Sequence, residues 1–88
     1  MKVAFKSSFA KDLHKLKDQS LKNKIKTIIE ATEQANALSD ITGIKKLKGE
    51  SGYYRVRVGN YRLGLFLEED TIYFVRFLHR KEIYRYFP

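Results

Sequence analysis

Three arginines in the second half of the chain are spaced so that they share one surface. Arg55 and Arg57 lie two residues apart in the alternating run YYRVRV at 53–58, and alternate residues of a β-strand point to the same face. The Gly-Asn pair at 59–60 predicts a two-residue hairpin turn, which brings Arg62 of the next strand beside them. These strands place no acid on this face to offset the repulsion. Clustered guanidinium groups are suited to the phosphate oxygens of a polynucleotide, whose unpaired bases would stack on aromatic rings nearby.

A purely structural explanation of these arginines also fits the sequence. Phe66 and Tyr61 lie on the adjacent strand, and arginine side chains can lie flat on aromatic rings through cation–π contacts. The arginines would then only cover part of the surface. The two explanations differ in whether the guanidinium groups stay open to a ligand.

The charge of the protein favours anionic partners. The 88 residues include 18 Lys and Arg but only 10 Asp and Glu, which gives a net charge of +8. Every arginine and ten of the twelve aromatic residues lie in residues 45–88. Arginine grips phosphate with a planar fork, whereas lysine is a mobile, strongly hydrated charge that suits an exposed helix face. We therefore expect the second half of the chain to bind a polyanion such as nucleic acid, or an acidic protein.

The residue types that are missing exclude several classes of site. The chain has no cysteine and only two histidines, His14 and His79, which excludes a disulfide framework, a thiolate zinc site and a cysteine nucleophile. We therefore predict that the protein works without a metal or cofactor, in a reducing compartment. No apolar run approaches the roughly 18 residues that a membrane span needs, and the charged start is unlike a secretory signal. The expected location is the cytoplasm, without membrane association.

Strand and helix patterns predict an α+β fold in a single domain, residues 1–88. In order, they indicate a strand, two helices and three strands, with the ranges 2–5, 9–16, 21–37, 53–58, 61–67 and 71–78. Ser7 or Ser8 is expected to cap the first helix, and residues 39–52 are expected to be a loop because the helical period is lost there. The last three strands should form an antiparallel meander packed on the helical hairpin, followed by a short C-terminal tail.

Alternation in the third strand of the meander assigns its two faces. It places Tyr73, Val75 and Phe77 on one face, and Ile72, Phe74, Arg76 and Leu78 on the other. His79 follows the phase of Phe77. We therefore expect His79 to be a packed side chain rather than a catalytic one.

Several motifs in the second half of the chain together resemble the RelE/ParE superfamily of bacterial and archaeal toxins. They are LKG at 47–49, YRVRVGNYRL at 54–63 and HRKEIY at 79–84, and the similarity extends over nearly the whole chain. The resemblance implies a small α+β toxin that a cognate antitoxin from the same operon holds inactive. For the RelE branch it implies an endoribonuclease that cuts messenger RNA in the ribosomal A site without metal.

The resemblance also assigns candidate catalytic residues. By position, the family's basic pair falls on Arg55 and Arg57, its strand arginine on Arg62, its late arginine on Arg80 and its C-terminal tyrosine on Tyr84. Two departures matter: the pair is often lysine in the RelE branch, and the spacing of the tail varies, so that Tyr86 is an alternative to Tyr84. The ParE branch, which inhibits DNA gyrase, shares much of the pattern and is the alternative function.

The chemistry of RNA cleavage gives these residues roles. Attack by the 2′-OH needs a base, cations that stabilise the charged phosphorane, and an acid for the leaving 5′-oxygen. Arg62 and Arg80 suit the phosphate clamp. The Tyr84 phenol would be the base, since a cationic surrounding favours the phenolate. Arginine is a poor proton donor, so the pair on the first strand would stabilise charge or position the RNA.

Five further basic residues are candidates for RNA binding. They are Lys45, Lys46 and Lys48 in the predicted loop, and Lys81 and Arg85 in the tail. The exposed arginine face also needs neutralising, so we expect the antitoxin to present an acidic segment to it.

Overall fold

A five-stranded mixed sheet forms the centre of the molecule. The computed structural model describes residues 1–88, and its strands run in the order β1-β5-β4-β3-β2. The strands are β1 (Lys2–Phe5), β2 (Ile44–Lys46), β3 (Tyr53–Val58), β4 (Tyr61–Glu68) and β5 (Thr71–His79). The last three form the antiparallel meander that the sequence predicts. β1 extends the sheet by pairing in parallel with β5, and β2 extends it by pairing antiparallel with β3.

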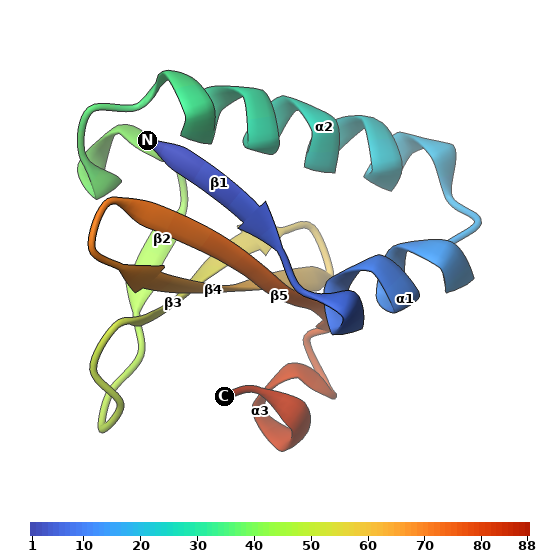
Figure 1. Ribbon diagram of the computed structural model, residues 1–88. Helices are drawn as coiled ribbons and strands as arrows, with labels where there is room; N and C mark the ends of the chain where they lie inside the picture. Colours follow the sequence, from blue (N-terminus) through green and yellow to red (C-terminus); the bar gives the residue numbers. More distant parts are fainter.

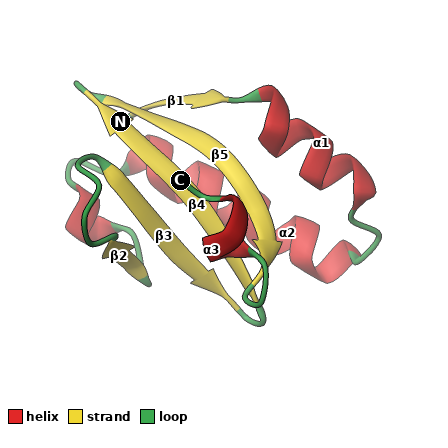
Figure 2. Ribbon diagram, turned by 90° about the horizontal axis from the view of Figure 1, so that it is seen from below, coloured by secondary structure: helices red, strands yellow, loops and turns green.

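The helices lie on both sides of this sheet. Figure 1 shows α1 (Ser7–Lys15) and α2 (Gln19–Gln34) on one side and the short α3 (Ile83–Tyr86) on the opposite side. α2 crosses the face of the sheet, while α1 lies beside β5, past the end of β1 (Figure 2). None of the helices combines the length and apolar character needed to cross a membrane. The mixture of a mainly antiparallel sheet with separate helices is the expected α+β fold.

The hydrophobic core fills the space between the sheet and the α1–α2 pair. Leu63 and Leu65 of β4 are fully buried there, as is Phe74 of β5. Phe9 of α1 and Ile25 of α2 close the core from the helix side. Each large apolar side chain buried in this way contributes about 1.5–3 kcal/mol to folding. Most of the stability therefore resides on one face of the sheet.

The two helices begin differently from each other. Asp18 caps α2 by accepting the N–H of Leu21 at 3.2 Å. α1 begins at Ser7 with Lys6 in the cap position and no side-chain cap, so the predicted serine cap is wrong. The hydroxyl of Ser8 instead donates to the carbonyl of Val75, which ties α1 to the sheet.

The stretch predicted to be a loop, residues 39–52, contains regular structure. A 3-10 turn (Leu38–Asp40) spans its start, and β2 pairs Ile44 with Val56 of β3. α2 ends at Gln34, earlier than the predicted 37, and Asp40 accepts the backbone N–H groups that follow the helix. With only three residues, β2 is too short for its alternation to be recognised in the sequence.

A β-bulge in β5 overturns the predicted faces of that strand. Leu65 pairs with Phe74 and Gly64 with Arg76, so Val75 has no partner in β4. The phase of the alternation therefore reverses at this point. The side chains that face the helices are Ile72 and Phe74 before the bulge and Phe77 after it. Arg76 and Leu78 consequently lie on the α3 side.

A bidentate ion pair fixes α1 to the bulge. The Asp12 carboxylate accepts two hydrogen bonds from the Arg76 guanidinium, at 2.8 and 3.0 Å, and a third from the backbone N–H of Phe77 at 2.9 Å. The hydrogen bond to Asp12 raises the pKa of Arg76 above the usual value for an arginine. The Asp12 side chain is only 7% exposed. Removal of either partner would leave a largely buried charge without compensation.

Candidate functional site

Three arginines share the sheet face that lies on the α3 side. Arg57 of β3 stands directly opposite Arg62 of β4, and Arg55 stands opposite Gly64. Cross-strand partners in an antiparallel pair carry their side chains on the same face, so the register brings the three together as the alternation predicts. None of them lies over an aromatic ring, since the cation–π contacts of the molecule involve Lys6, Arg76 and Arg85. The guanidinium groups of this face are therefore not engaged in stacking on aromatic rings.

Arg62 is held in place by the hairpin turn. Its Nη1 donates to the carbonyl oxygens of Gly59 and Tyr61, at 2.9 and 2.8 Å. These bonds engage only one of the terminal nitrogens, so the rest of the guanidinium fork can still reach a ligand. The arginine is thus positioned in advance of any substrate, which is the condition for electrostatic stabilisation of a transition state.

The charges around Arg62 identify its neighbours. Partial burial lowers its pKa, and the positive charges of Arg55, Arg57 and Arg80 lower it further, while Tyr84 acts in the opposite direction. The other four residues that the resemblance assigns to catalysis are therefore close enough to Arg62 to influence its pKa. A surface on which arginines repel each other is one that an anion stabilises.

Arg80 and Tyr84 reach this face through the turn after β5. The backbone N–H of Arg80 donates to the carbonyl of Asn60 at 2.8 Å, so the end of β5 is joined to the β3–β4 hairpin. α3 follows and is anchored by Ile83, which is fully buried. Tyr84 itself is 61% exposed, so its phenol is accessible to a ligand on the arginine face.

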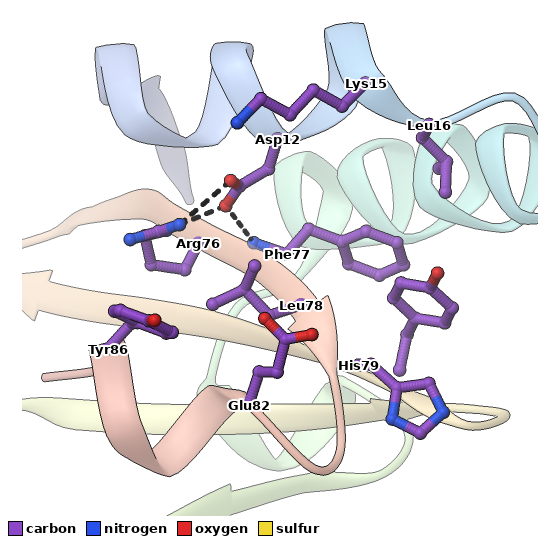
Figure 3. Close-up of a pocket in the computed structure, with 10 residues that line it drawn as sticks. Asp12, Lys15, Leu16, Arg76, Phe77, Leu78, His79, Glu82 and Tyr86 are labelled. Carbon is purple, nitrogen blue, oxygen red and sulfur yellow. Dashed lines mark hydrogen bonds and ion pairs between the residues drawn. The ribbon is translucent and has the colours of Figure 1, made fainter.

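Tyr86 lies on another side of α3. Its ring is 5.7 Å from the guanidinium carbon of Arg76, and it lines a cavity together with Glu82 and His79 (Figure 3). Tyr84, and not Tyr86, is among the groups that shift the pKa of Arg62. This effect and the contact of Tyr86 with Arg76 associate Tyr84, rather than Tyr86, with the arginine face.

A glycine in the middle of β4 provides the seat for α3. Phe87, directly after the helix, is buried against Gly64, where an added Cβ atom would stand 2.8 Å from the ring. Tyr53 of β3 meets the same ring edge-on, with 5.5 Å between centroids. Sequence analysis missed Gly64 and Phe87 as positioning residues, although a glycine inside a strand is a known sign of close approach by another segment.

The predicted RNA-binding lysines do not form one patch. Lys45 pairs with Arg55 and so lies on the arginine face, whereas Lys46 pairs with Tyr54 and lies on the opposite face. Lys48 is exposed in the loop after β2, which extends toward the α3 side of the sheet (Figure 1). In the tail, Lys81 and Arg85 are exposed, and the Arg85 guanidinium carbon lies 6.0 Å from the Tyr86 ring.

His79 is packed away from the arginine face. Its ring meets Tyr61 edge-on at 5.5 Å, and Tyr61 in turn stacks on Phe77 at 5.0 Å. Its Nδ1 accepts the backbone N–H of Lys81 at 3.2 Å. His14 is exposed on α1. No group of three or more His, Asp or Glu side chains is placed to hold a metal ion.

Comparison with known proteins identifies the family. The family model described as "ParE toxin of type II toxin-antitoxin system, parDE" matches residues 3–84, and Toxin RelE3 of Methanocaldococcus jannaschii is 51% identical over the full length of both chains. The chain belongs to the RelE/ParE toxin family. The resemblance deduced from the sequence motifs is thereby confirmed.

Solved structures of RelE/ParE toxins share this fold. The crystal structure of the RelB-RelE antitoxin-toxin complex from Methanococcus jannaschii contains a chain that is 48% identical, with a TM-score of 0.81 and coverage of 96% of this chain and 98% of that one. The isolated E. coli RelE toxin matches with a TM-score of 0.66 at 19% identity, over 96% and 90% of the two chains. The second match shows the fold alone.

Proposed function

We propose that this protein is the toxin of a type II toxin–antitoxin pair and that it cleaves messenger RNA bound to the ribosome, without a metal ion. The observation that carries the proposal is the cluster of Arg55, Arg57 and Arg62 on one open face of the sheet, with Arg80 and Tyr84 near enough to shift the pKa of Arg62. Membership of the toxin family and the similarity to Toxin RelE3 support it. An 88-residue protein with this site would act as a single domain in the cytoplasm, where messenger RNA is translated.

This face supplies a base and cations for the reaction, and the proton for the leaving oxygen comes from solvent. The ribose 2′-OH gives its proton to the base, the 2′-oxygen attacks the adjacent phosphorus, and the bond from phosphorus to the 5′-oxygen breaks as that oxygen takes up a proton. The products are a 2′,3′-cyclic phosphate and a 5′-hydroxyl, so no water is consumed in this step. Charge builds up on the phosphate oxygens in the transition state, and fixed cations placed there lower the barrier.

Each residue of the face has a role in this scheme. Tyr84 is the base that takes the proton of the 2′-OH, since its side chain is exposed to a ligand on the arginine face. Arg62, held by the hairpin turn, and Arg80 bind the phosphate oxygens. Arg55 and Arg57 position the neighbouring phosphates, because a guanidinium group is a poor proton donor.

The same face accounts for control by an antitoxin. A net charge of +8 with unpaired arginines favours an acidic protein segment, which would cover the face and exclude RNA. Structures similar to this chain include an antitoxin-toxin complex. The antitoxin gene is expected in the same operon.

The decisive experiment replaces Arg62. Arg62→Ala should lower the cleavage of messenger RNA on programmed ribosomes by about 10²-fold or more, as the loss of one preorganised donor typically does. Arg62→Lys keeps the charge but not the fork, and should recover only part of the activity. Lys24→Ala, which removes an exposed cation from α2, is the matched control. Normal cleavage by folded Arg62→Ala protein would disprove this site.

Inhibition of DNA gyrase is the second candidate function. It is favoured by the family model, whose description is that of the ParE toxin and which matches residues 3–84. In that case activity would depend on a protein-binding surface rather than on Arg62 and Tyr84. A supercoiling assay with purified gyrase separates the two: inhibition that survives both Arg62→Ala and Tyr84→Phe, with no RNA cleavage by the parent, would establish the second function.

A further inference from the structure

A second concave site lies at the open edge of β5, and Tyr86 of α3 lines it while Tyr84 does not. It is a cavity of about 380 Å³ between the end of α1 and the start of α3, which we term the β5-edge cavity (Figure 3). Its volume is within the range of small-molecule sites in proteins. The side chains that line it include Asp12, Lys15, Arg76, His79, Glu82 and Tyr86.

The cavity exists because β1 is shorter than β5. β1 pairs only with the first part of β5, from Thr71 to Phe74, so the second part of β5 has no neighbouring strand on that side. The Phe77 N–H faces this edge and donates to Asp12, and the His79 carbonyl accepts the N–H of Glu82. The floor of the cavity is therefore a fixed strand edge, and side chains from α1 and α3 form its walls.

The charged side chains of the cavity differ in whether they already have an ion-pair partner. Arg76 is engaged by Asp12 in the bidentate ion pair. The Glu82 carboxylate takes no part in any ion pair, and Figure 3 shows it directed into the cavity between Tyr86 and His79. Glu82 is therefore an unoccupied acceptor at the centre of the site.

His79 adds a donor to the lining of the same cavity. Its Nδ1 accepts the N–H of Lys81, so in the neutral ring the proton is on Nε2, which has no partner of its own. Lys15 provides a mobile cation. The cavity therefore offers an acceptor, a donor and a cation from three different side chains to a polar ligand.

Aromatic rings complete the site. Tyr86 is 52% exposed, with the Arg76 guanidinium near its ring, and the His79 ring lies across the cavity (Figure 3). Proteins that recognise single-stranded RNA stack unpaired bases on such rings and bind their Watson–Crick edges with side chains. The lining therefore matches a nucleobase better than an aliphatic or purely anionic ligand.

The position of the cavity relative to the arginine face agrees with such a ligand. Tyr84 and Tyr86 belong to the same four-residue helix, and Arg80 is only two residues from Glu82. An RNA strand whose phosphate lies on Arg62 and Arg80 would thus pass beside the turn that carries Glu82.

We propose that the β5-edge cavity binds an unpaired base of the RNA substrate beside the cleaved bond and selects bases with an amino group on the Watson–Crick edge. A carboxylate accepts from an amino group, so Glu82 would favour adenine, cytosine or guanine over uracil at this position. The inference rests on the proposed function, because the RNA is placed by the arginine face. A protein segment is the competing occupant, and the test below distinguishes it.

The test compares two near-isosteric changes that remove the same carboxylate. Glu82→Met leaves the backbone hydrogen bonds of the turn intact, whereas Glu30→Met, on the exposed side of α2, is the control. Ribosomes are programmed with messengers that differ by one base beside the cut. The parent and Glu30→Met should prefer amino-bearing bases over uracil, and Glu82→Met should reduce this preference about tenfold while it still cleaves the uracil messenger.

A binding measurement separates this inference from the proposed function. Cytidine, added to isotopically labelled protein, should shift the amide signals of Phe77 and His79 more than uridine does, and Glu82→Met should abolish the difference. This outcome supports the cavity as a base site even if the parent cleaves no messenger, in which case the proposed function fails alone. Unchanged base preference in Glu82→Met, with cleavage intact, overturns the inference alone. Loss of antitoxin affinity in Glu82→Met without a change in base preference would also overturn it, because the cavity would then be a protein site.

Discussion

The two faces of the central sheet are built from the same strands but do opposite work. On the helix side, Leu63, Leu65 and Phe74 are fully buried beneath α1 and α2. On the α3 side, Arg57 is exposed and Arg55 and Arg62 are only half-buried. One face is closed and apolar, and the other is open and cationic. The comparison shows how a small protein can hold mutually repelling charges: the opposite face supplies the stability that the functional face lacks.

The difference also separates stability from activity along the chain. Arg62, Leu63 and Gly64 are consecutive, yet they bind the hairpin turn, fill the core and seat Phe87, respectively. Substitutions one residue apart should therefore have unrelated effects. The predictions that follow use such pairs.

The largest effect is expected in the core. Phe74→Ala removes a fully buried ring that contacts Phe9 and Phe5, and should lower the free energy of unfolding by about 3–5 kcal/mol. Urea denaturation followed by circular dichroism measures it. RNA cleavage by Phe74→Ala should be lost only under conditions in which the variant unfolds. A loss below 1 kcal/mol would mean that the two faces contribute to stability more equally than we infer.

The second prediction concerns the two tyrosines of α3. Tyr84→Phe should lower cleavage by about 10²-fold or more, because the phenol oxygen acts as the base. Tyr86→Phe should retain most cleavage, since Tyr86 lies against Arg76 and not on the arginine face. Neither change should alter the melting temperature, because both side chains are more than half exposed. Antitoxin affinity should hold as well, because each change keeps the ring and removes only the phenol oxygen.

The opposite pattern in the tyrosine pair would place the base at Tyr86. Full activity in both variants would remove tyrosine from the mechanism and would favour the gyrase-inhibitor alternative. Single-turnover cleavage on purified ribosomes is the appropriate measurement, because it separates the chemical step from ribosome binding.

Local patterns in the sequence were sufficient to predict the arginine face. Alternation in two adjacent strands and a Gly-Asn turn determine that Arg55, Arg57 and Arg62 lie together, and all of these signals come from neighbouring residues. The long helix and the order of the meander were predictable for the same reason.

Features set by contacts between distant segments could not be predicted in this way. The bulge at Val75 reverses the phase of β5, and the backbone around it is bound by Ser8 and Asp12, more than sixty residues earlier in the chain. The choice between Tyr84 and Tyr86 depends on how Phe87 packs on Gly64. Neither contact leaves a periodic signal in the sequence.

The seat of α3 provides the third prediction. In Gly64→Ala the new methyl group would overlap the Phe87 ring, which must move and carry α3 with it. We expect a loss of about 1–3 kcal/mol in stability and about a tenfold loss of cleavage, because small displacements of catalytic groups are costly. The arginines themselves remain in place.

A double-mutant cycle tests whether this effect passes through Phe87. Once Phe87→Ala has emptied the seat, adding Gly64→Ala should cost almost nothing further in cleavage. If the two losses are simply additive, Gly64 acts through the strand and not through the position of α3.

The smallest expected effect comes from two adjacent lysines. Lys45 shares the arginine face, while Lys46 points to the other side of the sheet. If RNA lies on the arginine face, Lys45→Ala should weaken binding and flatten the dependence of log affinity on log salt by roughly 0.7 per lost phosphate contact. Lys46→Ala removes the same charge and should leave the slope unchanged. Titration of a catalytically inactive Arg62→Ala background with messenger-programmed ribosomes at several salt concentrations measures both. Equal slopes for the two variants would show that the net charge, rather than one face of the sheet, governs the encounter with RNA.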